Sequence, residues 1–82
     1  QAALAGAHGY YKLAANLRRA AELAVMPDDE LLAVYNALRP RRATHAELTD
    51  LAGRMETTYG AVETARFIRE AADAYRAVGL TP

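Results

Sequence analysis

Few residues of this chain could carry out chemistry, and their spacing does not bring them together. His8 and His45 are the only histidines, and cysteine is absent. A zinc site would need both imidazoles and a carboxylate such as that of Glu47, because zinc binds nitrogen, sulfur or oxygen ligands in a set of four. A solvated position at the start of a helix is the simpler explanation of His45. We therefore expect no metal site.

Nucleophilic catalysis lacks its components as well. Serine is absent, so a Ser-His-Asp arrangement is not indicated. Several threonine hydroxyls fall at a helix start or on helix surfaces, and the tyrosines are typical of cores and interfaces, where the ring buries a large area and the hydroxyl needs one partner. These residues are Thr44, Thr49, Thr57, Thr58, Tyr10, Tyr11, Tyr35, Tyr59 and Tyr75. The sequence predicts a chain that is not catalytic on its own.

Three consecutive acids, Asp28, Asp29 and Glu30, could be read as a cation site. They directly follow Pro27, however, at the start of a predicted helix, where carboxylates accept from free N–H groups and complement the helix dipole. Helix capping, with Asp28 as the capping residue, explains the cluster without a ligand.

Three arginines surround Pro40 and could contact phosphate, namely Arg39, Arg41 and Arg42. A free-standing helical regulator that binds protein or DNA is therefore the alternative class. Against DNA binding, the formal net charge is zero, with ten basic and ten acidic residues. No predicted helix carries a run of exposed Arg, Asn or Gln suited to base edges.

Length and composition limit the remaining classes. The 82 residues allow one domain, residues 1–82, whose core would supply only about 3–5 kcal/mol of net stability. A permanent partner would compensate for so small a core, and a net charge of zero favours association. No apolar run reaches the roughly 20 residues that span a bilayer, and the lack of cysteine suits the cytoplasm. We expect a soluble, cytoplasmic protein.

The spacing of apolar residues predicts an all-α fold of about four helices. The first helix is long, ends near Val25 before Pro27, and is softened by Gly6 and Gly9. Its helical pattern is already present at Leu4, so we expect it to be truncated at its N-terminus. One face of this helix carries Ala3, Gly6, Tyr10, Leu13, Leu17, Ala20 and Ala24.

Two shorter helices are predicted next, over 28–39 and 44–59. The first of them places Leu31, Leu32, Tyr35 and Leu38 along one side. The second opens with a capping box of Thr44 and Glu47 and stops at Gly60. Its inner stripe is Leu48, Leu51, Ala52 and Met55, and Asp50 and Arg54 are spaced for an ion pair on its outer side.

The fourth predicted helix, 61–78, carries two apolar stripes. The first consists of Ala61, Ala65, Ile68, Ala72 and Tyr75, and the second of Phe67, Ala71, Ala74 and Val78. A domain this small can cover only one of them, so the second is expected to meet a partner. Ion pairs are predicted between Arg66 and Glu70 and between Arg69 and Asp73, and Gly79 is placed as a left-handed cap on which Leu80 folds back.

Specific segments carry a family resemblance. They are Arg18-Arg19-Ala-Ala-Glu22-Leu, the run Met26-Pro-Asp-Asp-Glu30-Leu-Leu-Ala-Val-Tyr35-Asn-Ala-Leu-Arg-Pro40, Ala46-Glu47-Leu48, Phe67-Ile68-Arg69-Glu70, and Tyr75. With these segments the chain resembles the small (gamma) subunit of the adenosylcobalamin-dependent diol and glycerol dehydratases. The likeness covers most of the 82 residues, and the family's small subunits look longer at the N-terminus.

The resemblance implies a non-catalytic subunit of a hydro-lyase that converts 1,2-propanediol or glycerol to an aldehyde by radical chemistry. In that family the reaction takes place in a barrel of the large subunit, and adenosylcobalamin lies between the large and medium subunits. The small subunit packs on the large one and does not bind the cofactor. Such enzymes are often housed in bacterial microcompartments. No nucleic acid or membrane partner is implied.

The expected contact surface combines the end of the second predicted helix with the second stripe of the fourth. It consists of Tyr35, Leu38, Arg39, Arg41, Arg42, Phe67, Ala71, Ala74 and Val78.

Overall fold

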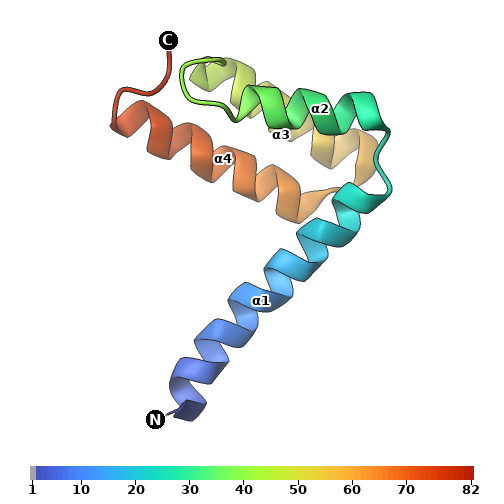
Figure 1. Cartoon of the computed structure of the whole chain (residues 1–82), viewed down its shortest axis with the longest axis vertical. Coiled ribbons are helices and arrows are strands. Elements are labelled where there is room, and N and C mark those ends of the chain that lie inside the picture. The colour runs from blue at the N-terminus through green and yellow to red at the C-terminus, as the bar shows by residue number, and fades with distance from the viewer. Residues whose placement is uncertain (1) are drawn as a thin grey trace.

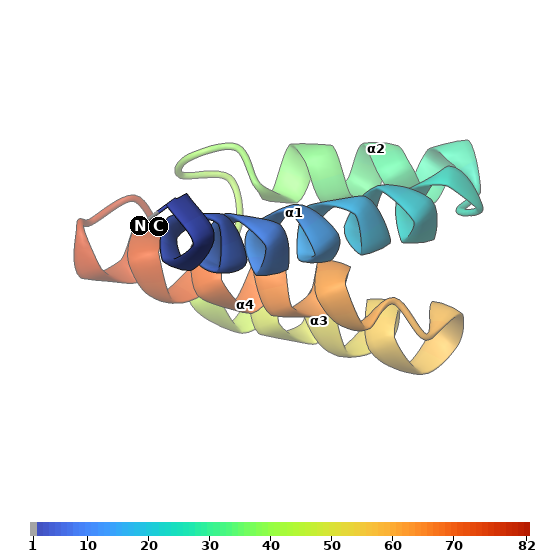
Figure 2. The same ribbon diagram turned by 90° about the horizontal axis from the view of Figure 1, so that it is seen from below.

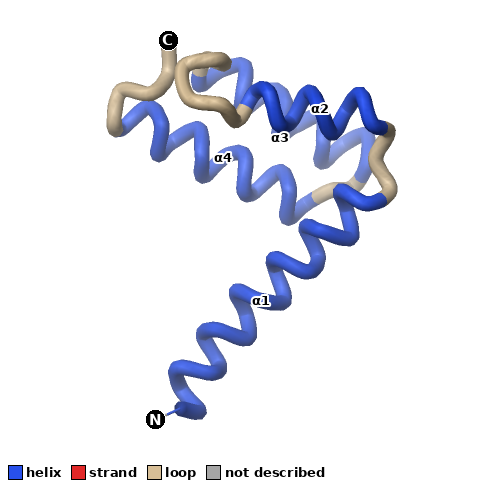
Figure 3. The backbone as a smooth tube through the Cα atoms, in the orientation of Figure 1, coloured by secondary structure: helices blue, strands red, loops and turns tan. Residues whose placement is uncertain are grey.

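Helices α3 (His45–Tyr59) and α4 (Val62–Ala77) pack directly against each other, and the other two helices attach to this pair (Figure 1). Helix α1 (Ala2–Ala24) precedes α2 (Asp28–Ala37) in the chain. This computed structural model describes residues 2–82, with the backbone alone for residues 2–8 and 10. Residues 2–82 contain four helices and no strand, so the predicted all-α class is confirmed (Figure 3).

The core lies along the contact between α3 and α4. Both predicted inner stripes are buried there, and the buried alanines let the two helix backbones approach closely. The core residues are Met26, Val34, Ala43, Leu48, Leu51, Ala52, Met55, Ala61, Ala65, Ile68 and Ala72, with Tyr75 partly buried against them.

Helix α3 begins and ends as predicted. The Glu47 N–H donates to Thr44 Oγ1 at 3.0 Å, and the Thr44 N–H donates to Glu47 Oε1 at 2.8 Å. This capping box satisfies two backbone donors that a helix start leaves free. At the other end Gly60 has a φ of 63°, a left-handed conformation that glycine adopts without steric cost.

Helix α2 differs from the prediction at both ends. The expected cap by Asp28 is wrong, because Pro27 occupies the capping position and no side chain caps the helix. The three acids lie instead in the first turn, where they complement the dipole. The helix ends at Ala37 rather than Arg39, because a residue that precedes proline disfavours helical backbone angles.

Helix α1 does not join a compact four-helix bundle. Only its C-terminal part meets α4, and the rest projects away from the other helices (Figures 1 and 2). On the predicted apolar face, Leu13 is 55% and Leu17 is 62% exposed. Leu23, which was not assigned to that face, packs on the core instead. The expectations for the side chains of Ala3 and Tyr10, and for Gly6, lie outside the described side chains. At Gly9 no neighbouring atom lies within 4 Å of a Cβ position.

The ion pairs predicted within single helices are wrong. The three pairs were Asp50–Arg54, Arg66–Glu70 and Arg69–Asp73. Arg54 Nη2 instead lies 2.9 Å from Glu30 Oε1 of α2, and Arg69 Nη2 lies 2.8 Å from Glu56 Oε1 of α3. Arg54 and Arg69 therefore pair with carboxylates on neighbouring helices and not with the carboxylate one turn away on their own helix.

Helix α2 is held to α3 through Glu30. Besides the pair with Arg54, the Tyr59 hydroxyl donates to Glu30 Oε2 at 3.0 Å. Burial and this bond to a carboxylate raise the pKa of Tyr59, so the hydroxyl keeps its proton and remains a donor. These contacts fix the N-terminal end of α2.

The C-terminal residues follow the predicted left-handed cap. Gly79 has a φ of 76°, and the Leu80 N–H donates to the Tyr75 carbonyl at 2.8 Å. This turn carries the chain back toward the segment after α2. Within residues 2–82 no helix combines the length and the apolar character that crossing a membrane requires.

We predict that Thr44→Ala lowers the free energy of unfolding by about 1 kcal/mol, because it removes the acceptor for the Glu47 N–H. Urea unfolding followed by circular dichroism would measure the loss. Thr44→Ser retains the hydroxyl and serves as the control, with stability close to that of the original chain. Equal stability of all three chains would contradict this role for the capping box.

Candidate partner interface

The end of α2 and the turn that follows it present a mixed apolar and basic surface. Tyr35 is 66% exposed, whereas Leu38 is half-buried against the core. The side chains of Arg39, Arg41 and Arg42 are exposed. Leu38 therefore anchors this surface from beneath, and the other four predicted interface residues of the segment remain accessible.

Two long-range hydrogen bonds hold this turn against the end of α4. The Tyr75 hydroxyl donates to the Leu38 carbonyl at 2.7 Å, and the Arg41 N–H donates to the Leu80 carbonyl at 2.7 Å. Arg41 has a φ of 63° and is the one residue other than glycine among residues 2–82 with a positive φ. The turn is thus fixed in a conformation that costs energy for an arginine.

The second stripe of α4 is only partly free. Val78 is 70% exposed, Ala74 is exposed and Ala71 is half-buried. Phe67 is 40% exposed, and the guanidinium of Arg19 from α1 lies 4.2 Å from the centre of its ring. A cation above an aromatic face is attractive, so Phe67 contributes to the contact between α1 and α4, and the free part of the stripe lies toward Val78.

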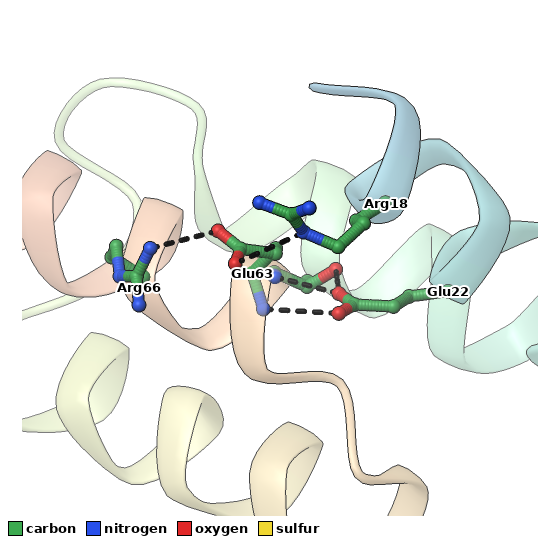
Figure 4. A network of polar contacts seen from close by, with 5 residues as sticks. Arg18, Glu22, Glu63 and Arg66 are labelled. Atoms are coloured by element: carbon green, nitrogen blue, oxygen red, sulfur yellow. Dashed lines mark hydrogen bonds and ion pairs between the residues drawn. The ribbon is translucent and has the colours of Figure 1, made fainter. Parts of the chain in front are cut away.

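The carboxylate of Glu22 joins α1 to the start of α4 (Figure 4). Glu22 Oε1 accepts from the Thr64 N–H at 2.8 Å and from the Thr64 hydroxyl at 2.7 Å, and Oε2 accepts from the Glu63 N–H at 3.0 Å. The local capping residue of α4, Ala61, has no side chain that could do this. Glu22 therefore caps α4 from another helix.

The neighbouring carboxylate of Glu63 is paired with two arginines. Glu63 Oε2 lies 3.5 Å from Arg18 Nε, and Glu63 Oε1 accepts from Arg66 Nη1 at 3.0 Å (Figure 4). Burial opposes the charged form of Glu22, but the bonds from Thr64 and Glu63 and the charge of Arg18 outweigh it, so the pKa of Glu22 is lowered. The carboxylate is thus held in its ionised form.

Two cavities lie beside these contacts. One, of about 690 Å³, lies between α2 and α3, and the other, of about 280 Å³, lies between α1 and α4. The larger is lined by Ala33, Asn36, Ala37, Arg42, Ala43, Glu47, Asp50, Leu51 and Arg54. The smaller is lined by Tyr11, Lys12, Ala15, Asn16, Arg19, Glu63, Arg66, Phe67 and Glu70. Polar and charged side chains make up most of the residues that line each cavity, and neither lining contains a histidine.

Comparison with known proteins identifies the family. The family described as dehydratase small subunit matches residues 1–80. The chain belongs to the dehydratase small subunit family. The predicted resemblance is thereby confirmed over nearly the whole chain.

Two curated relatives carry the description propanediol dehydratase small subunit, one from Salmonella typhimurium and one from Citrobacter freundii. The chain is 49% identical to each over 75 residues, which is 92% of its own length. The match covers 43% of the Salmonella protein and 44% of the Citrobacter protein. The chain therefore spans less than half the length of these relatives.

The structure also gives His45 a partner that its position in the sequence did not indicate. Its Nε2 lies 2.8 Å from Asp73 Oδ1 of α4, and its side chain is 25% exposed. His45 is the first residue of α3, as predicted, and its ring is partly solvated, but the packing of α3 against α4 also gives it a carboxylate partner. Among the described residues, no group of three metal-ligating side chains converges.

Sequence analysis missed the contact between Glu22 and Thr64. Thr64 is 1% exposed and is the one buried polar residue among the described side chains, yet it was not among the threonines considered above. A signal was available, since a helix that starts after Gly60-Ala61 lacks a local capping side chain. That signal does not reveal which distant residue supplies the cap.

We predict that Glu22→Gln lowers the free energy of unfolding by about 1–3 kcal/mol at neutral pH, because neutral Gln weakens charge-assisted bonds to three donors. Urea unfolding would measure this, with Glu70→Gln as the control, since exposed Glu70 forms no ion pair with any described residue. A Glu70→Gln loss equal to that of Glu22→Gln would contradict the cap.

The pH dependence of this difference has a defined sign. The pKa of Glu22 is lower in the folded chain than its ordinary value of 4.5. The stability that its charge contributes is therefore fully present above pH 4.5 and is lost as the pH falls through the lower folded value. The difference in free energy of unfolding between the original chain and Glu22→Gln should therefore become smaller in that pH range. A difference that grew on acidification would contradict the role of ionised Glu22 as the cap of α4.

Proposed function

We propose that this chain acts as the non-catalytic small subunit of a coenzyme B12-dependent dehydratase of 1,2-propanediol or glycerol. Membership of the dehydratase small subunit family supports the proposal most directly. The names of the two relatives favour propanediol over glycerol as the substrate of the complex. The role of the chain itself is to bind and stabilise the subunit that carries out the reaction.

The accessible apolar surface supports a binding role. Large apolar side chains remain exposed on three of the four helices and on the connection after α1, although the core is small. They include Tyr11, Leu13, Leu17, Val25, Leu32, Tyr35, Val62, Phe67 and Val78. Exposed apolar area of this extent on a small chain is typical of a protein that is buried in a complex.

Adenosylcobalamin is proposed to bind to the other subunits. The residues of this chain do not fit adenosylcobalamin, because few large apolar side chains that could pack on a corrin ring line the two cavities between the helices. The one described histidine, His45, is engaged with Asp73. The cofactor would supply the radical chemistry within the complex, and no step of that chemistry involves a residue of this chain.

The proposed partners are the large and medium dehydratase subunits, with the large subunit in direct contact. We propose that the complex works in the cytoplasm, where related dehydratases are often housed in bacterial microcompartments. The lack of cysteine is consistent with a reducing compartment.

Co-purification tests the proposal. We expect the tagged chain, expressed with the large and medium subunits of the same organism, to form a stoichiometric complex that produces aldehyde when adenosylcobalamin is added. Omitting this chain should reduce the amount or the stability of the complex. A folded chain that binds neither subunit would contradict the proposal.

We predict that Tyr35→Glu weakens this complex at least ten-fold and leaves the substrate preference of the remaining activity unchanged, because it places a charge in an apolar contact. Size-exclusion chromatography and the aldehyde assay would measure both effects. Thr58→Glu adds the same charge on an exposed site of α3 and serves as the control.

Phe67→Glu should also weaken binding, but it disturbs the contact with Arg19 as well, so Tyr35 gives the cleaner test. Assembly equal to that of the original chain in both the Tyr35 and Phe67 variants would exclude this surface.

A further inference from the structure

The turn at residues 38–43, called here the arginine turn, holds positive charge without an internal counter-charge. Arg39 and Arg41 form no ion pair with any described side chain, and they line neither of the two cavities. Arg42 also forms no ion pair, although Glu47 and Asp50 line the same cavity. Elsewhere, Arg18, Arg54, Arg66 and Arg69 each have a carboxylate partner, and Arg19 lies over the ring of Phe67. Arg76 in the last turn of α4 is a single exposed arginine without an ion pair to a described side chain, whereas the arginine turn gathers three.

The position of these arginines is fixed by the fold. The Leu38 carbonyl accepts from Tyr75, and the Arg41 N–H donates to the Leu80 carbonyl, so both sides of the turn are tied to the end of α4. Ala43 is buried at the end of the turn. A fixed turn loses little conformational entropy when it binds, which favours its use as a contact.

Arg41 occupies a backbone conformation that glycine would adopt more easily. Its φ of 63° is left-handed, and a residue with a side chain is unfavourable there. The fold at this site requires a left-handed residue but not a cation. A strained arginine in place of a glycine is therefore a sign that the side chain is needed for function.

Apolar residues adjoin the arginine turn on α2. Leu32 is 59% and Tyr35 is 66% exposed. Their spacing of three residues places both side chains on one side of α2, and Arg39, in the turn that follows the helix, is exposed as well. The surface therefore suits a partner with an apolar patch bordered by carboxylates.

We infer that the arginine turn is the electrostatic anchor of the contact with the large dehydratase subunit and binds a carboxylate-rich surface of that partner, beside an apolar contact made by Leu32 and Tyr35. The inference rests on the proposed function and adds the chemistry of the partner surface. Arginine suits this role because its planar guanidinium binds a carboxylate through two parallel hydrogen bonds.

The test uses the full complex and compares Arg41→Glu with Arg41→Gly. Arg41→Glu should weaken binding of the small subunit to the other subunits about ten-fold or more at low salt. Arg41→Gly removes the charge and relieves the backbone, so it should also weaken binding while the melting temperature of the chain stays the same or rises. If Arg41 had only a structural role, binding would not weaken in a variant whose melting temperature is unchanged or higher.

Arg69→Asn is the matched control, because it removes one exposed positive charge from the contact between α3 and α4. It should leave the affinity within two-fold of the original. The affinity of the original chain should fall as salt is raised from 50 to about 300 mM, because screening grows over this range. The fall should be shallower for Arg41→Gly.

Several results would overturn the inference. If the original chain assembles but both Arg41 variants bind within two-fold of it at every salt concentration, the anchor is wrong and the proposed function stands. If the original chain binds neither subunit, the proposed function itself fails. A dimer of the isolated chain that Arg41→Glu dissociates would assign the turn to self-association through the acids at the other end of α2. Binding of duplex DNA that Arg41→Glu abolishes would assign it to nucleic acid.

Discussion

The close contact between α3 and α4 is the constraint on which the rest of the structure depends. Its buried positions alternate large side chains such as Leu48, Met55 and Ile68 with alanines, and the alanines allow the backbones to come near. This pair holds most of the core. The other helices bury few residues of their own and must attach to it.

Each attachment is made by a small number of polar contacts between distant parts of the chain. Glu30 ties the start of α2 to α3, and the hydroxyl of Tyr75 ties the end of α2 to α4. Glu22 ties α1 to α4. A charged or hydroxyl group in such a contact fixes position well but covers little apolar area, so the attached helices keep exposed apolar surface. A chain with this balance is suited to be one part of a larger assembly.

The two halves of the predicted interface differ in physical character. The segment after α2 is basic and exposed, and a hydrogen bond ties it to α4, whereas Phe67 of the α4 stripe contacts Arg19 of α1. The residues that sequence reasoning grouped by apolar spacing therefore do not all have the same role. The most accessible of them lie around Tyr35 and the arginine turn and at Val78.

Local features were predictable because their causes lie within a few residues. The stops at Pro27 and Gly60, the capping box of Thr44 and Glu47, the left-handed Gly79 and the inner stripes of α3 and α4 all follow from backbone geometry and helical spacing. The family could also be recognised from the sequence, because the order of residues 16–42 is distinctive. The sequence by itself thus determined the helices, most of the core and the family.

The tertiary structure alone decided which groups meet between helices. The partners of Glu22, Arg54 and Asp73 are on other helices. Spacing along the sequence predicted the wrong partner for Arg54 and for Asp73, and no partner for Glu22. The direction of α1, the exposure of Leu13 and Leu17, and the strained backbone of Arg41 likewise depend on packing. The physical reason is that a local pattern states which faces are apolar, whereas the pairing of charges depends on distances that exist only after the helices have packed.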